Sequence, residues 1–153
     1  MTEVGFYHLT RSTLEEALPR LLEKAYAAGQ RALVRVGDAE RVELLNRVLW
    51  TFERASFLPH GARADGHAER QPIYLTAGEE NPNGARLLFL VDGAVAPDLA
   101  AFDRCLDLFD GGDPEAVERA RGRWREAVAQ GHRCVYWQQG ERGGWVKAAE
   151  AAG

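Results

Sequence analysis

Hydrophobic positions along the chain alternate between short β-favouring runs and longer stretches with helical spacing. The short runs, rich in Val, Leu and aromatic residues, predict strands over residues 4–9, 32–36, 72–76, 86–92 and 134–138. Apolar residues three and four positions apart predict helices that run to Gly29, from Asp38 to about Phe52, and from Pro114 to just before Gly131. Strands that alternate with helices across short turns are typical of an α/β fold with parallel pairing.

The ends of the predicted helices carry recognisable capping residues. Ser12 is the expected N-cap of the first helix, with Glu15 three residues later, and Gly29 is the expected stop. Asp113 is a favourable N-cap for the third helix, and Pro114 suits its first turn. The third helix is therefore the best-delimited element of the sequence.

Several segments break the rhythm of strands and helices. Residues 55–71 are polar and irregular, which predicts an exposed loop, and Asn-Pro-Asn-Gly at 81–84 predicts a turn. Residues 99–102 suggest a short helix or turn, while residues 105–109 fit either its continuation or a further strand. The end of the chain from about residue 147 has no predicted element and is a candidate for disorder.

One uninterrupted apolar run points to the centre of the sheet. Leu87 to Val91 are five consecutive hydrophobic residues, as expected of a parallel strand buried on both faces. We therefore predict a single α/β domain over 1–153, with a mostly parallel sheet flanked by helices on both faces. It should be Rossmann-like but without a phosphate-binding loop, because the first predicted strand is followed by Thr10, Arg11 and Ser12 and no GxxxxGK[ST] or GxGxxG motif occurs.

Composition narrows the possible functions. Of 153 residues, 46% are hydrophobic and 27% charged, which is ordinary for a globular domain, and the formal net charge is −4. An acidic balance argues against a protein whose main task is to grip the nucleic-acid backbone. The chain opens without the pattern of a signal peptide and has no apolar run of about 20 residues, so we expect a cytoplasmic protein with no membrane contact.

Residue types that perform catalysis or hold metals are scattered. Cys105 and Cys134 lie in apolar runs and are expected to be buried, reduced thiols. The histidines are not at metal-ligand spacing, and no metal or cofactor is expected; His60, between Pro59 and Gly61, is the one most suited to a structural hydrogen bond. Asp38 and Asp92 follow predicted strands, which leaves a small hydrolase with carboxylates at the sheet edge as an alternative.

The third predicted helix carries the most distinctive cluster. Arg121, Trp124 and Arg125 are neighbours at helical spacing, so two guanidinium groups flank an indole. Such a patch suits a carboxylate joined to a hydrophobic group, such as the end of an acidic peptide. The alternative is that Trp124 belongs to the core and the arginines are solvated, with Glu118 pairing with Arg121. A direct nucleic-acid contact is a further alternative, through the arginines of this region: Arg119, Arg121, Arg123, Arg125 and Arg133.

A second possible interface involves aromatic residues near the end of the second helix. Trp50 and Phe57 either cover the sheet edge or anchor a partner protein, as exposed aromatic residues near helix ends often do.

Taken in order, short motifs along the chain resemble the chi subunit family of bacterial DNA polymerase III. They are Phe6-Tyr7-x-Leu9, AYAAGQRALV around Gly29, Leu49-Trp50 followed by SFLPHG, the Pro-Ile pair at 72–73, FDRCLDLFDG, and ARGRW ahead of GHRCVYWQQ. The resemblance covers most of the chain. It implies a non-catalytic α/β accessory subunit of the polymerase holoenzyme that binds no nucleotide and needs no cofactor.

The resemblance also implies two partners. One surface would bind the acidic, Phe-ended C-terminal tail of single-stranded DNA-binding protein, with the family's basic and aromatic positions falling on Arg121, Trp124 and Arg125 and an apolar position near Phe109. The family often has tyrosine in place of Trp124 and lysine in place of Arg125. The other surface, matching Trp50 and Phe57, would bind the small psi subunit of the clamp loader, or another clamp-loader subunit where psi is absent. Nucleic acid would then be contacted only indirectly.

Overall fold

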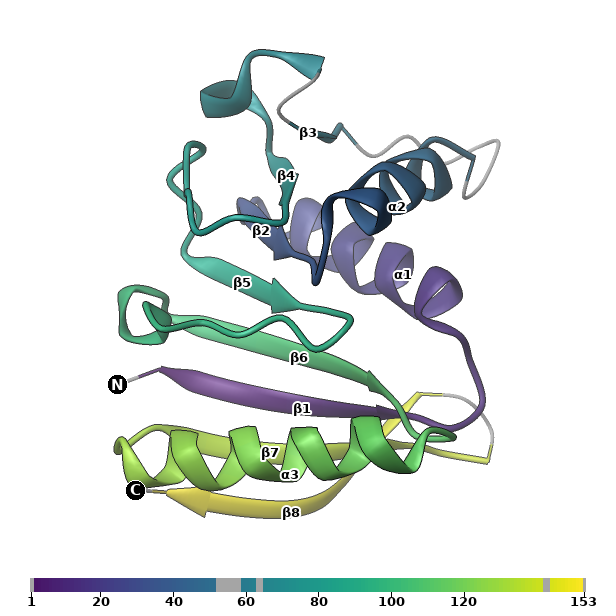
Figure 1. Ribbon diagram of the computed structural model, residues 1–153, viewed down its shortest axis with the longest axis vertical. Helices are drawn as coiled ribbons and strands as arrows, with labels where there is room; N and C mark the ends of the chain where they lie inside the picture. Colours follow the sequence, from purple (N-terminus) through teal and green to yellow (C-terminus); the bar gives the residue numbers. More distant parts are fainter. Residues whose placement is uncertain (1, 52–58, 63–64, 142–143, 153) are drawn as a thin grey trace.

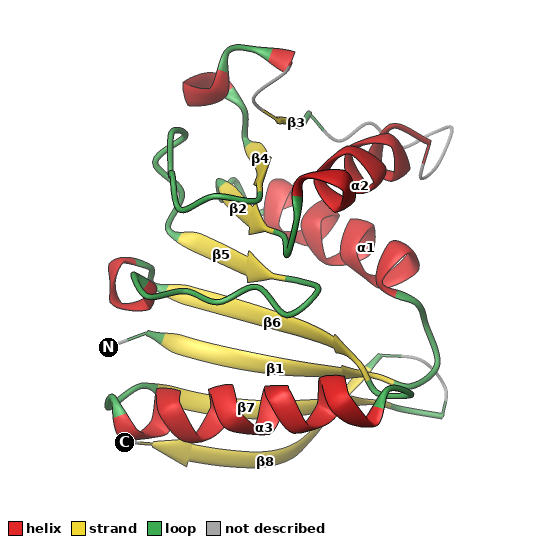
Figure 2. Cartoon of the chain, in the orientation of Figure 1, coloured by secondary structure: helices red, strands yellow, loops and turns green. Residues whose placement is uncertain are grey.

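An eight-stranded sheet organises the computed structural model, which describes residues 2–51, 59–62, 65–141 and 144–152 (Figures 1 and 2). The strands, in chain order, are β1 (Glu3–Leu9), β2 (Ala32–Arg35), β3 (Gly61–Ala62), β4 (Ile73–Thr76), β5 (Leu87–Leu90), β6 (Arg104–Asp110), β7 (Arg133–Gln139) and β8 (Trp145–Ala152). Their spatial order is β3-β4-β2-β5-β6-β1-β7-β8. Every pair is parallel except β7 with β8.

Helices cover both faces of this sheet, as the sequence predicts. The helices are α1 (Leu14–Ala27), α2 (Ala39–Thr51) and α3 (Pro114–Ala129). Leucines of α1 and α2 pack with Val34 and Leu75 on one face, whereas Ala120 and Ala127 of α3 pack with Phe6 on the other. The chain thus forms a doubly wound α/β domain in which β1 and β6, at the centre, lead to helices on opposite faces. No helix within the described residues is both long and apolar enough to cross a membrane.

The start of α1 lies one residue later than the sequence predicts. The N-cap is Thr13, whose backbone N–H and hydroxyl both donate to the Glu16 carboxylate, at 3.2 and 3.0 Å. Ser12 is engaged elsewhere, because its N–H donates to Gln139 Oε1 (3.1 Å) and its hydroxyl accepts from Gln139 Nε2 (2.8 Å). The prediction for Gly29 is confirmed: it adopts φ +74° just past the helix, where a side chain would be strained.

The segment that fits either helix or strand is β6. Cys105 to Phe109 are all buried, and the strand pairs with both β1 and β5. Both cysteines are buried free thiols, as predicted, and burial raises the pKa of Cys134 to about 11. A short helical turn at Leu99–Ala101 precedes this strand, also as predicted.

The region between α2 and β4 is only partly described, because residues 52–58 and 63–64 lie outside the described residues. The prediction of a wholly exposed loop is wrong for Gly61–Ala62, a buried strand that pairs with β4. Asp65 Oδ2 accepts from the Ala62 N–H at 2.8 Å and stabilises this pair. Two residues are too few to show a strand period in the sequence.

Residues 134–138 form a strand, as predicted, within β7, but the prediction that it is the last strand is wrong. β8 follows and pairs antiparallel with β7, with a register shift opposite Tyr136 and Trp137. The Trp145 indole of β8 meets the Tyr7 ring edge-to-face, with 4.9 Å between centroids. Glu150 forms ion pairs with both Arg133 and Lys147. Alanine-rich strands held by such tertiary contacts carry little β signal of their own.

A buried ion pair fixes α3 against the sheet. Arg123 donates two hydrogen bonds to the Asp107 carboxylate, from Nε at 2.6 Å and from Nη2 at 3.0 Å, and the side chains are only 15% and 3% exposed. Burial raises the pKa of Asp107, and the hydrogen bonds from Arg123 oppose that rise. Because a planar guanidinium binds a carboxylate in one orientation, this pair sets the rotation of α3 about its axis.

A second ion pair holds the segment between β5 and β6. Arg35 is 2% exposed at the end of β2, donates to both oxygens of Asp98 at 2.7 and 3.2 Å, and also donates to the Gly78 carbonyl. The hydrogen bond from Arg35 lowers the pKa of Asp98. This segment therefore packs over the α3 face of the sheet where no helix covers β5.

Replacing Arg123 with alanine should destabilise the fold by about 3–5 kcal/mol, because it leaves the Asp107 carboxylate buried and unpaired. Urea unfolding at pH 7 measures the change. Arg119→Ala is the matched control, since Arg119 is exposed on the same helix and lies 3.8 Å from Glu115; its effect should stay within about 0.5 kcal/mol. Equal effects of the two substitutions would contradict this role for Arg123.

The Arg35–Asp98 pair should make stability fall in acid. Because the folded-state pKa of Asp98 is lowered, its stabilising contribution is complete above the ordinary Asp pKa of about 4 and is lost as pH falls through the folded value. The free energy of unfolding, measured in urea from pH 7 to pH 3, should therefore decline more steeply in the natural chain than in Asp98→Asn. Parallel pH profiles would show that Asp98 contributes nothing to acid sensitivity.

Candidate functional site

Helix α3 presents the cluster singled out in the sequence. Asp113 caps the helix by accepting from the Glu115 N–H at 3.0 Å, and Pro114 occupies the first turn. Ala120, Arg123 and Ala127 face the sheet. Residues between these inward positions point outward, so Arg121 and Arg125 lie on the surface and Trp124 at its boundary. We call Arg121, Trp124 and Arg125 the α3 patch.

The two guanidinium groups of the α3 patch share one acidic neighbour. Glu118 lies 3.7 Å from Arg121 and 3.7 Å from Arg125, and all three side chains are about two-thirds exposed, at 65% and 67% for the arginines. These separations exceed the roughly 2.7–2.9 Å of a direct charge-assisted hydrogen bond, and exposed pairs of this kind contribute little. One carboxylate between two guanidinium groups also leaves the α3 patch with a net positive charge.

Trp124 is half-buried, so the core interpretation and the binding interpretation each hold in part. Its ring meets Phe6 at 5.4 Å and Tyr136 at 6.2 Å between centroids, both edge-to-face. These contacts fix the indole in one orientation while part of it stays exposed beside the arginines. The α3 patch therefore offers an aromatic surface held in place next to two exposed cationic groups.

Tyr136 of β7 also belongs to this site, although its position in the sequence did not indicate this. Its hydroxyl forms a hydrogen bond with Nδ1 of His8, and Arg121 lies near enough to act on the phenol. Burial raises the pKa of Tyr136, and the positive charge of Arg121 partly opposes this rise. Alternation along 133–139 was the available signal, since it puts residues 134 and 136 on the same face.

Phe109 lies behind the site. It is 5% exposed, stacks on the His8 ring with 5.2 Å between centroids, and stands 6.1 Å from the Tyr136 ring. Phe109 thus supports Tyr136 from within the core and contributes little surface to a ligand. His8 Nε2 is buried there and has no hydrogen-bond partner among the described residues.

The second predicted interface is described only at Trp50. Its side chain is 55% exposed at the end of α2, and its ring lies 4.7 Å from that of His60. His60 is buried, and its Nε2 forms a hydrogen bond with the Asn46 carbonyl oxygen at 3.1 Å, the structural bond that the sequence suggests. Phe57 lies outside the described residues.

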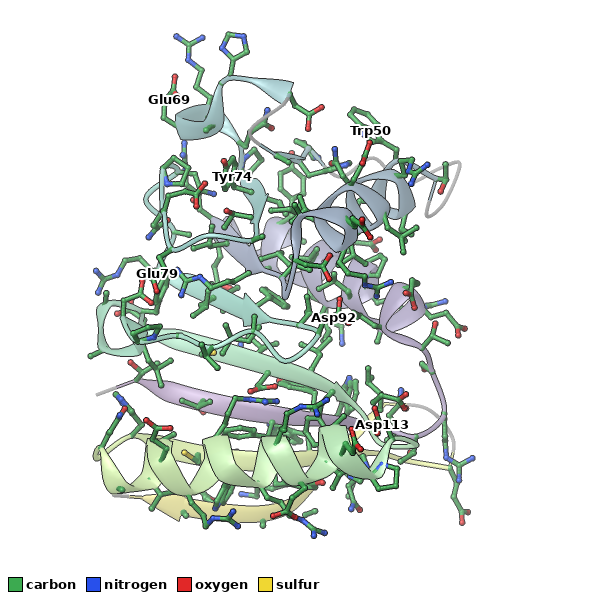
Figure 3. The ribbon with its side chains drawn as sticks, viewed as in Figure 1. Trp50, Glu69, Tyr74, Glu79, Asp92 and Asp113 are labelled. Atoms are coloured by element: carbon green, nitrogen blue, oxygen red, sulfur yellow. The ribbon has the colours of Figure 1, made fainter. Side chains whose placement is uncertain are left out.

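The carboxyl edge of the sheet holds a hollow of about 450 Å³ at the point where enzymes of this fold class bind ligands. Asp92 lies there (Figure 3), but its carboxylate accepts from Arg41 at 2.7 Å, and Arg41 also binds Glu15 at 3.0 Å. The Asp38 carboxylate accepts the Arg41 backbone N–H at 2.9 Å. Both carboxylates proposed for a hydrolase are thus committed to structural bonds with Arg41.

The five arginines of the 119–133 region do not form one basic surface. Arg123 is turned into the core, Arg119 lies near Glu115, and Arg133 binds Glu150 at 2.7 Å. This distribution disfavours a helix that tracks a nucleic-acid backbone, which needs several cations on one face.

Sequence comparison now assigns a family. The family model described as "DNA polymerase III chi subunit, HolC" matches residues 1–134. The chain belongs to the DNA polymerase III chi subunit family. Chi is an accessory, non-catalytic subunit of the replicative polymerase.

Two relatives agree with the family assignment. The chain is similar to the DNA polymerase III subunit chi of Pseudomonas aeruginosa, with 31% identity over 137 residues that cover 86% of this chain and 93% of the relative. It is also similar to the probable DNA polymerase III subunit chi of Rickettsia prowazekii, with 35% identity over 91 residues. That match spans 60% of this chain and 55% of the Rickettsia protein.

Proposed function

We propose that this chi-family chain is an adaptor that binds the acidic C-terminal tail of single-stranded DNA-binding protein through the α3 patch. Its other surface, around Trp50, binds psi or another clamp-loader subunit. The chain thereby links the clamp loader to DNA that is already covered by its binding protein. Contact with nucleic acid is indirect, and the site of action is the cytoplasm.

The arrangement of Arg121, Arg125 and Trp124 is the observation that carries the proposal. A tail that ends in phenylalanine presents a terminal carboxylate and acidic side chains beside an aromatic ring. The carboxylates would replace Glu118, whose 3.7 Å contacts are long, and would form direct bonds with the guanidinium groups. The phenylalanine ring would pack on the exposed part of Trp124.

The neighbouring strands leave room for such a peptide. Ala149 of β8 is paired with Tyr136 and therefore points to the same face of the sheet as Tyr136. The Ala149 side chain is only a methyl group, so the surface beside Tyr136 and α3 is open on the β8 side. An extended peptide could lie on this open surface with its acidic groups toward α3.

The expected affinity is modest and salt-dependent. Charge-assisted hydrogen bonds contribute about 1.5–3 kcal/mol each. A short tail that is disordered when free must be ordered on binding, so a Kd in the micromolar range, about −8 kcal/mol, is reasonable. Because the arginines are exposed, added salt should weaken binding.

The two proposed surfaces lie at opposite ends of the molecule. In Figure 3, Trp50 stands at one end of the longest axis, and α3, which starts beside Asp113, runs across the other. Both partners could bind at once without touching. This separation supports a bridging role.

Replacing Arg125 with alanine should weaken tail binding about tenfold or more, because one charge-assisted contact is lost. The measurement is a fluorescence-anisotropy titration with the labelled C-terminal tail peptide of the organism's single-stranded DNA-binding protein. Arg119→Ala is the matched control and should bind normally. Unchanged affinity in Arg125→Ala would remove Arg125 from the site.

Glu118 provides a test of opposite sign. Glu118→Gln removes the negative charge shared by both arginines, so tail affinity should rise by a few-fold, about the effect of one exposed ion pair. A fall in affinity would mean that Glu118 positions the arginines for the tail and does not compete with it.

The Trp50 surface should act independently of the α3 patch. Trp50→Ala should reduce recovery of clamp-loader subunits from native lysate on immobilised protein by roughly 30-fold if Trp50 is a central anchor. Recovery of single-stranded DNA-binding protein should not change. Tyr26→Ala, at a ring 42% exposed on α1, is the control. Undiminished clamp-loader recovery would exclude Trp50 from that interface.

A further inference from the structure

The face of the sheet opposite α3 carries a groove that neither surface of the adaptor uses. Its hollow measures about 340 Å³ and lies between the C-terminal half of α1 and the strands β5, β6, β1, β7 and β8. Tyr7, Trp137 and Trp145 form one side, and Leu87, Phe89 and Leu106 form its apolar floor. We call this hollow the aromatic groove.

The aromatic groove exists because α1 and α2 leave part of their face open. Both helices lie over the β2 side of the sheet, and neither extends over β7 and β8 (Figures 1 and 2). There the rings cover one another: Tyr7 stacks on Trp137 at 6.3 Å and meets Trp145 edge-to-face at 4.9 Å. Both indoles remain half-buried.

The rim of the aromatic groove is cationic. Lys24 and Arg104 line it and are exposed, and none of the described carboxylates does so. Arg104 donates to the Tyr7 hydroxyl at 3.3 Å, and no ion pair joins Lys24 or Arg104 to a carboxylate among the described residues. Glu3 is the cross-strand neighbour of Arg104 but is not part of the lining.

The positive charge continues beyond the rim. A second hollow of about 270 Å³ shares Arg104 with the aromatic groove and adds Arg31, Arg86 and Asp103. Arg86 pairs with Asp103, whereas Arg31 donates to the carbonyls of Glu69 and Asn83, which carry no full charge. The lining of this second hollow thus holds three arginines and one carboxylate, so it is positively charged. The chain as a whole has a formal net charge of −4.

We propose that the aromatic groove is a second peptide-docking site, which takes an acidic segment of a partner protein that carries an aromatic or aliphatic side chain. The apolar side chain packs between Trp137 and Trp145, and the adjacent carboxylates bind Arg104 and Lys24. This match of an apolar floor with a cationic rim identifies the occupant.

A nucleic-acid strand fits the groove less well than a peptide does. A single strand needs a basic channel that follows its backbone over several nucleotides. Here two cations stand at one rim of a short hollow, and the chain as a whole is acidic. Two carboxylates beside one apolar side chain match the number and placement of these cations.

The four tryptophans allow a direct test, because Trp50, Trp124, Trp137 and Trp145 lie in three different places. Their indole N–H signals, in an NMR spectrum of the 15N-labelled full chain, are assigned by single Trp→Phe variants. The probe is the peptide Asp-Asp-Leu-Phe, acetylated and amidated so that only its side chains are charged. Titration to about 1 mM should shift the signals of Trp137 and Trp145, since a site with a Kd of that order is then half-filled.

Charge dependence separates docking from non-specific apolar contact. The double variant Lys24→Gln/Arg104→Gln should bind at the groove about tenfold or more weakly, because each charge-assisted hydrogen bond is worth at least that factor. The matched Asn-Asn-Leu-Phe peptide should leave both signals unchanged. Circular dichroism confirms folding of the double variant, in which only exposed side chains change.

Several outcomes would overturn the proposal. One is that Trp137 and Trp145 do not respond, or respond equally in the double variant. Another is that a ten-nucleotide deoxythymidine strand shifts these signals and the peptide does not. A third is that the shifts depend on protein concentration, which would make the occupant a second copy of the chain. In each case the α3 patch is judged separately, through Arg125→Ala and the Trp124 signal.

Discussion

The rotation of α3 about its own axis determines what this molecule can bind, and one buried contact sets that rotation. Arg123 reaches inward to Asp107 through two hydrogen bonds, with both groups almost removed from water. Arg121 and Arg125, two positions away on either side, must then point outward. A helix turned about its axis would carry Arg123 away from Asp107 and the alanines away from the sheet.

The sheet supplies the remaining geometry. Strand β1 lies between β6 and β7, and its successive side chains point to opposite faces of the sheet. Phe6 contacts Trp124 and His8 contacts Tyr136 on one face. Tyr7 contacts Trp137 and Trp145 on the other. One strand thus underlies aromatic clusters on both faces. Neither cluster depends on the usual ligand crevice at the carboxyl edge, where Arg41 holds Asp92 and Glu15. The fold keeps a doubly wound topology, and the ion pairs of Arg41 line the crevice at its carboxyl edge.

The sequence predicted local features well and long-range features poorly. Asp113 and Pro114 delimited α3, and Leu87 to Val91 marked a central strand, because those signals are local or periodic. The Ser12 cap was wrong since Gln139, more than a hundred residues away, engages Ser12. Tyr136 and β8 were missed for the same reason: their roles come from packing against distant residues, which no short window of sequence contains.

The outer edge of the sheet has a consequence for how the molecule behaves in a crowded assembly. β8 ends the sheet with Lys147 and Glu150 and carries a register shift in its pairing with β7. Charged side chains and irregular pairing at an open edge discourage strand addition by other chains. At this edge the molecule is thereby protected against edge-to-edge aggregation. The aromatic surfaces on its two faces then stay available to partners that do not add a strand.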